Sequence, residues 1–120
     1  MRVLIVDDSQ LVRRGIKDLF APGGSWDVCG EASNGEEALR QAQTLQPDAI
    51  LLDISMPGTD GLETARLLRK QMPEAKILIM SQHDASLLTA AAIEAGAHGC
   101  VDKSRLSADT LPGILSQLFC

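Results

Sequence analysis

Short runs of apolar residues, too short to form a helix, recur along this chain of 120 residues. The run from Ala49 to Leu52 is unbroken and follows Pro47, which is typical of a strand buried on both faces of a parallel sheet. A second run, from Trp26 to Gly30, alternates apolar and polar residues as an edge strand does. Strands are therefore expected at 3–6, 26–30, 49–53, 77–80 and 99–101.

Between these runs, apolar residues recur at the spacing of a helix. Ser9 is expected to cap the first helix, and Asn34 with Glu37 has the spacing of a capping box at the second. Pro112 fits the last helix only within its first turn. Helices are predicted over residues 10–20, 34–45, 61–72, 87–95 and 107–119.

The alternation of strands and helices predicts an α/β fold, with a doubly wound parallel sheet and short connections. No linker, repeat or low-complexity segment interrupts the pattern, and the length suits one domain covering residues 1–120.

Composition narrows the class of protein further. The chain has 22% charged and 45% apolar residues and a net charge of -5, so it offers no basic stripe for nucleic acid. No apolar stretch approaches the roughly 20 residues that cross a bilayer. Cys29, Cys100 and Cys120 are odd in number and widely spaced, which favours reduced thiols over a disulfide framework or a zinc site. A cytoplasmic protein without direct contact to nucleic acid or membrane is expected.

Polar residues follow the ends of the predicted strands. Because the carboxyl ends of parallel strands share one edge of the sheet, these side chains should converge there. Three carboxylates held together repel one another and invite a hard divalent cation such as Mg²⁺. An ammonium group beside them suits a phosphoryl oxygen. The residues concerned are Asp7, Asp8, Asp53, Ser81 and Lys103.

With these motifs in place, the chain resembles a response-regulator receiver domain of two-component systems over its whole length. The resemblance implies a flavodoxin-like (βα)5 fold with five parallel strands in the order 2-1-3-4-5. Residues 31–38 and 81–84 look most like receiver domains that precede LuxR-type helix-turn-helix modules, the NarL/FixJ subfamily. The motifs are Val6-Asp7-Asp8, Asp53 with Met56-Pro57-Gly58 and Asp60-Gly61, Ser81, and the segment from Ala95-Gly96-Ala97 to Lys103.

The resemblance implies a role for each polar residue. Asp53 would accept a phosphoryl group from a phosphohistidine or from a small donor such as acetyl phosphate. Asp8, Asp53 and the backbone carbonyl of Ser55 would ligate Mg²⁺, and Asp7 would act through water. Lys103 would pair with the phosphoryl group, and the Ser81 hydroxyl would move to bond it. Transfer of this kind depends on positioning and charge neutralisation.

The implied partners are a sensor histidine kinase or a phosphotransfer protein, and a second copy of the chain after phosphorylation. The implied output is control of an attached DNA-binding domain, and thus of transcription. The domain would not be an enzyme, although it would assist its own phosphorylation and dephosphorylation.

Some positions depart from the family pattern or carry no assigned role. Cys100 stands three residues before Lys103, where an aromatic switch residue is common, and Gln82 is bulkier than the small residue often found there. His83 is expected either to tune the lifetime of a phosphoryl group or to lie on a surface loop. His98 is expected to be a solvated turn residue, and Trp26 has no assigned role.

Three other classes remain open. The first is an interaction module of the same fold that works without phosphorylation, which Cys100 favours and the intact polar set opposes. The second is a phosphatase of the haloacid dehalogenase type, which would need a second aspartate where Ser55 stands. The third is a flavodoxin, which would need a phosphate-binding loop after the first strand.

Overall fold

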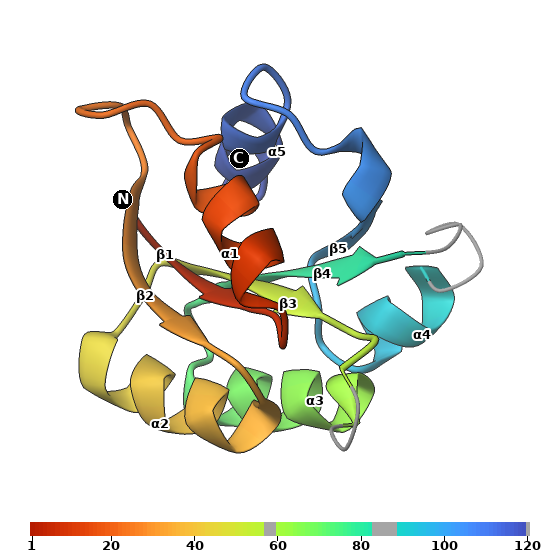
Figure 1. Cartoon of the computed structure of the whole chain (residues 1–120). Helices are drawn as coiled ribbons and strands as arrows, with labels where there is room; N and C mark the ends of the chain where they lie inside the picture. The colour runs from red at the N-terminus through yellow and green to blue at the C-terminus, as the bar shows by residue number, and fades with distance from the viewer. Residues whose placement is uncertain (57–59, 83–88, 120) are drawn as a thin grey trace.

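A computed structural model describes residues 1–56, 60–82 and 89–119 (Figure 1). Strands and helices alternate along the chain, as predicted. Among the described residues, no helix has the length and apolar character needed to cross a membrane. The elements are β1 (Arg2–Val6), α1 (Gln10–Lys17), β2 (Asp27–Ala32), α2 (Gly35–Leu45), β3 (Ala49–Asp53), α3 (Gly61–Gln71), β4 (Lys76–Ser81), α4 (Thr89–Glu94), β5 (Gly99–Asp102), the 3-10 helix η2 (Lys103–Arg105) and α5 (Leu111–Gln117).

The five strands form one parallel sheet in the order β2-β1-β3-β4-β5, which confirms the predicted fold. β3 lies at the centre and all its residues are buried, as its unbroken apolar run indicates. β2 lies at an edge, in agreement with its alternating pattern. The order reverses beside β1 and β3, and this switch point is where doubly wound sheets bind ligands.

Helices cover both faces of the sheet, and each face has its own core (Figure 1). On one face, α2, α3 and α4 pack small and branched residues such as Ala38, Leu68 and Ala92 against Leu4, Leu52 and other strand residues. On the other face, α1 and α5 contribute Ile16, Leu111 and Leu115. Successive residues of β3 therefore point into different cores, which explains why none of them is polar before Asp53.

The predicted caps are present at the helix starts. The Ser9 side chain accepts a hydrogen bond from the Val12 amide, and Asn34 accepts one from Glu37. The Glu37 carboxylate bonds back to the amide of Ser33 rather than to Asn34, so the capping box is displaced by one residue. Asp60 caps α3 by accepting from two amides.

Three predicted elements have boundaries that differ from the structure by one to four residues. α1 ends at Lys17, not Phe20, and β2 covers Asp27–Ala32 rather than 26–30. The last helix begins at Leu111 instead of 107, because the Thr110 hydroxyl accepts the Ser107 amide and closes a turn there. Pro112 lies in the first turn of this helix, as predicted.

Trp26 and His98 have structural contacts that the sequence did not indicate. Trp26 is only 3% exposed, and its indole donates to the Ser116 hydroxyl of α5 at 3.1 Å. His98 is half-buried, which corrects its expected place on a solvated turn. Its Nδ1 accepts the Ile77 amide at 3.1 Å, and burial lowers its pKa, with the charges of Lys76 and Arg69 acting in the same direction.

Candidate functional site

Two buried carboxylates and one exposed carboxylate meet where β1 and β3 end. Asp7 and Asp53 are each 1% exposed, whereas Asp8 faces solvent. One oxygen from each of the three side chains lies within 4.8 Å of the others. β1 and β3 pair in register up to Val6 and Leu52, so the next residues, Asp7 and Asp53, lie side by side. The predicted convergence of these aspartates is therefore observed.

Lys103 reaches the two buried carboxylates from the far end of the chain. Its Nζ lies 2.6 Å from Oδ2 of Asp7 and 3.1 Å from Oδ2 of Asp53. Lys103 follows β5, and β4 separates β5 from β3, so its long side chain spans the end of β4. The ammonium group thus neutralises part of the charge that the sheet gathers at this edge.

The two buried carboxylates are held in the same way. Oδ1 of Asp7 accepts the amide of Ser9, and Oδ1 of Asp53 accepts the amide of Ser55, each at 2.9 Å. In both residues Oδ2 faces Lys103. Each carboxylate is therefore fixed by the turn that follows its own strand, and both turn the same oxygen toward a shared cation.

The electrostatics of the site favour added positive charge. Burial raises the pKa of Asp53 and the charge of Asp7 adds to this, while the Ser55 amide and Lys103 act in the opposite direction. Burial acts to lower the pKa of Lys103, but its hydrogen bonds to Asp7 and Asp53 outweigh this and raise it. Three carboxylates and one ammonium leave two negative charges, which one divalent cation would balance.

The donor set suits a hard cation. Carboxylate oxygens are the ligands that Mg²⁺ prefers, and it commonly binds through one or two of them while it keeps several waters. Asp8 is exposed and can reach such an ion from solvent. Thiols and imidazoles are absent from this cluster of described residues, so the donors do not suit zinc.

The other predicted residues lie around this cluster. Ser81 ends β4 and is fully buried, Ser55 and Gln82 are exposed, and Met56 is buried. Cys100 is half-buried in β5 and packs against the core beneath α3 and α4. The predictions that concern Pro57, Gly58, His83 and Cys120 lie outside the described residues.

The sequence pattern did not indicate one further residue of this region. Arg13 of α1 donates from Nη1 to the backbone carbonyl of Asp7 at 2.6 Å and from Nε to Glu31 at 3.0 Å. Its position four residues after the cap Ser9 places it near the helix start, but helical spacing alone does not tell which charged residue turns back to the strand.

Comparisons with known proteins agree on one family. The model of the response regulator receiver domain matches residues 3–113. The chain is 38% identical over 92% of its length to the transcriptional regulatory protein LnrK of Bacillus subtilis and covers 50% of that protein. It is 38% identical over 93% of its length to the nitrate/nitrite response regulator protein NarL of Escherichia coli and covers 52% of it. The chain thus spans about half the length of these curated relatives.

A solved structure gives the same result. The two-component response regulator of the LuxR family from Aurantimonas sp. SI85-9A1 superposes with a TM-score of 0.87 at 35% identity, covering 98% of this chain and 84% of that one.

Proposed function

The chain belongs to the response regulator receiver domain family, and on that premise we propose that Asp53 accepts a phosphoryl group in a magnesium-dependent reaction. Receiver domains of this family are signalling domains, and this one is related to those of NarL and LnrK. We further propose that residues 1–120 act as one receiver domain.

The observation that carries the proposal is the shared environment of Asp53 and Asp7 around Lys103. In the proposed reaction, a carboxylate oxygen of Asp53 bonds to phosphorus while the bond from phosphorus to the donor nitrogen or oxygen breaks. The leaving group keeps the electron pair: the imidazole nitrogen of a phosphohistidine takes up a proton, whereas acetyl phosphate releases acetate. Lys103, already 3.1 Å from Asp53, is placed to pair with a phosphoryl oxygen. The buried Ser81 hydroxyl at the end of β4 is the proposed second donor.

The proposed ligands of Mg²⁺ are Asp8, Asp53 and the backbone carbonyl of Ser55, with Asp7 acting through water. When bound, the ion would neutralise charge on the carboxylates and on the phosphoryl oxygens. Asp7 and Asp53 keep their orientation through the Ser9 and Ser55 amides, so their oxygens need little rearrangement to receive it. Preorganised charge of this kind is the main resource of phosphoryl transfer.

The proposed phosphodonor is a sensor histidine kinase or a phosphotransfer protein in the cytoplasm. The proposed output surface is the face formed by α4, β5 and α5, where a second copy would dock after phosphorylation. This face is chosen because Ser81 and Lys103 lie at the ends of β4 and β5, so a phosphoryl group would act on these elements first.

A DNA-binding domain under the control of this face is proposed from the relatives. LnrK is named a transcriptional regulatory protein, and the solved relative is described as a LuxR-family regulator. The chain itself, with a net charge of -5, is not proposed to contact DNA. Its contribution to dephosphorylation is likewise proposed as assistance at Asp53 rather than as a separate enzymatic activity.

Labelling with acetyl phosphate tests the proposal. The parent protein should gain one phosphoryl group in intact mass when Mg²⁺ is present and none when EDTA replaces it. Asp53→Asn should stay unlabelled, whereas Asp109→Asn, which removes an exposed carboxylate from the turn before α5, should label as the parent does. Labelling of Asp53→Asn at the parental rate would refute the assignment.

Cys100 favours a second candidate function, an interaction module that works without phosphorylation. The half-buried thiol cannot act as the aromatic switch common at this position. This candidate predicts that partners bind equally well before and after labelling, so partner binding by both forms separates the two.

A further inference from the structure

Arg13 ties the acidic turn after β1 to the neighbouring strand β2. Its side chain is 15% exposed, and its guanidinium donates to the Asp7 carbonyl at 2.6 Å and pairs with Glu31 at 3.0 Å. Glu31 lies next to Ala32, whose carbonyl accepts the Asp7 amide at 3.0 Å. One side chain of α1 therefore connects the end of β1 with the end of β2.

This connection fixes the peptide unit between Asp7 and Asp8. Arg13 holds its carbonyl oxygen, while the Asp7 side chain is held separately by Ser9 and Lys103. The orientation of this peptide decides where the Cα of Asp8 lies and so where the exposed Asp8 carboxylate points. Within residues 1–56, 60–82 and 89–119, the Asp8 side chain makes no hydrogen bond or ion pair, whereas Asp7 and Asp53 are each held at both oxygens.

The planar guanidinium suits this task. It presents several donors in a rigid fork, so that one group can bond a carbonyl and a carboxylate at fixed angles. Glu31 fixes the fork from the other side and is itself 3.7 Å from Lys17. A lysine at position 13 would carry the same charge but only one point of attachment.

We propose that Arg13 is a positioning residue for the magnesium site, acting through the Asp7–Asp8 peptide to aim the Asp8 carboxylate. The inference rests on the proposed function of Asp8 as a magnesium ligand. Partners that orient metal ligands commonly change metal affinity by about 10- to 100-fold.

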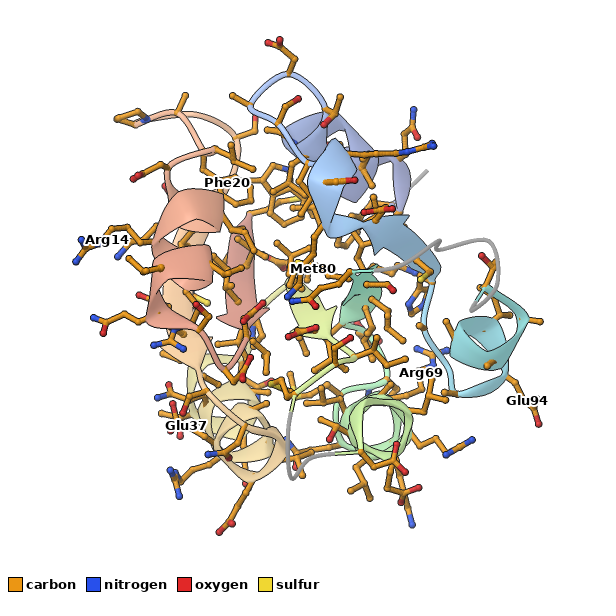
Figure 2. The ribbon with its side chains drawn as sticks, turned by 45° about the vertical axis from the view of Figure 1, so that its right-hand side comes forward. Arg14, Phe20, Glu37, Arg69, Met80 and Glu94 are labelled. Carbon is orange, nitrogen blue, oxygen red and sulfur yellow. The ribbon has the colours of Figure 1, made fainter. Side chains whose placement is uncertain are left out.

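The two possible roles of Arg13, as a positive charge and as a positioning group, predict opposite effects of its removal on Mg²⁺ affinity. If Arg13 acted only as a positive charge beside the site, its removal would strengthen the binding of a cation. If it positions Asp8, its removal weakens binding despite the gain in negative charge. Arg14, the next residue, projects away from the protein (Figure 2). Its replacement removes the same charge as replacement of Arg13 but leaves the contacts to Asp7 and Glu31 in place.

The experiment measures Mg²⁺ affinity by titration of the whole chain with Mg²⁺ alone, followed through the amide chemical shifts of Ser9 and Ser55. Arg13→Gln should bind Mg²⁺ about tenfold more weakly than the parent. Arg13→Lys should recover only part of that loss, and Arg14→Gln should bind as tightly as the parent or more tightly. Equal or tighter binding by Arg13→Gln, or full recovery by Arg13→Lys, would overturn the proposal.

A second pair of variants holds charge constant. Glu31→Gln keeps an oxygen that can accept from Arg13, whereas Glu31→Ala does not, and both lose one negative charge. Positioning predicts weaker Mg²⁺ binding in Glu31→Ala than in Glu31→Gln, and equal binding would overturn it. This pair decides the matter if Arg13→Gln fails to fold.

A purely structural role would lower the melting temperature in EDTA and leave the affinity of the folded variants unchanged. A parent that binds no Mg²⁺ would instead refute the proposed function, and this inference with it.

Discussion

Lys103 and Asp7, separated by 96 positions in the sequence, are joined by a 2.6 Å contact between Nζ and Oδ2. The contact connects the end of the last strand with the end of the first, across two intervening strands. Lys103 lies closer to Asp7 than to Asp53, at 3.1 Å. Both carboxylates thus share the Lys103 ammonium group, and Asp7 makes the shorter of the two contacts.

Replacement of Lys103 should destabilise the fold. Lys103→Met would leave two buried carboxylates without their cation, and breaking a buried pair costs about 3 kcal/mol. Part of this loss should return in the double variant with Asp53→Asn, because only Asp7 then remains charged. Urea unfolding in EDTA measures both effects. Arg105→Met, at an exposed position two residues on, is the control, and a Lys103→Met protein as stable as this control would contradict the expected coupling.

Loss of charge at Asp53 should stabilise the metal-free protein. The pKa of Asp53 is raised in the fold, so its ionised form costs free energy of folding at neutral pH. Asp53→Asn keeps an oxygen that can accept the Ser55 amide and should gain about 1 kcal/mol, as replacement of strained functional residues often does.

In the presence of Mg²⁺, the parent should become more stable than Asp53→Asn. Binding to the native parent alone adds roughly 2.7 kcal/mol at a hundredfold excess over Kd, and Asp53→Asn or Asp8→Asn should lose most of that gain. Melting curves of parent and variants, in EDTA and in Mg²⁺, test both statements. A parent that ignores Mg²⁺, or variants that melt below it in EDTA, would show that the carboxylates do not share a site.

The fold could be predicted almost entirely from the sequence because its strands are local and strongly patterned. The convergence of Asp7, Asp8, Asp53 and Lys103 could also be predicted, since in a parallel sheet the strand ends must share an edge. Contacts between distant segments could not. Trp26 meets Ser116 across 90 positions, and no apolar period indicates that pairing. The contact of Arg13 with the end of β1 could not be predicted for a related reason. Arg14 and Lys17 on the same helix are also basic, and only the structure shows which of the three faces β1.

His98 should make the stability depend on pH. Its Nδ1 accepts the Ile77 amide, which only the neutral ring can do, and its folded pKa lies below the unfolded value of about 6.5. The stabilisation is therefore complete above that value and falls as the pH drops toward the folded pKa.

His98→Asn should remove this pH dependence. The Asn oxygen can replace Nδ1 as acceptor and does not titrate. Unfolding free energies measured between about pH 8 and pH 5 test the point, with His83→Asn as the control for the other histidine. A parental slope that persists in His98→Asn would contradict the assignment.

Phosphorylation should alter the face formed by α4, β5 and α5 more than the rest of the surface. The expected observation is a set of amide shift changes that extends from Ser81 and Lys103 into these elements, while α2 changes little. α2 lies near β2, at the edge of the sheet opposite β5, and serves as the internal control (Figure 1). Shift changes that spare β5 and α5 would contradict the proposed output surface.

The residue that carries the phosphoryl group decides whether Asp53 is the acceptor. The parent, labelled with acetyl phosphate and Mg²⁺, would be digested at acidic pH and its peptides sequenced by mass spectrometry. We expect the phosphoryl group on Asp53 alone, in the peptide that contains the end of β3. A phosphoryl group on Asp7, Asp8 or any other residue, with Asp53 unmodified, would contradict the assignment of Asp53 as the acceptor.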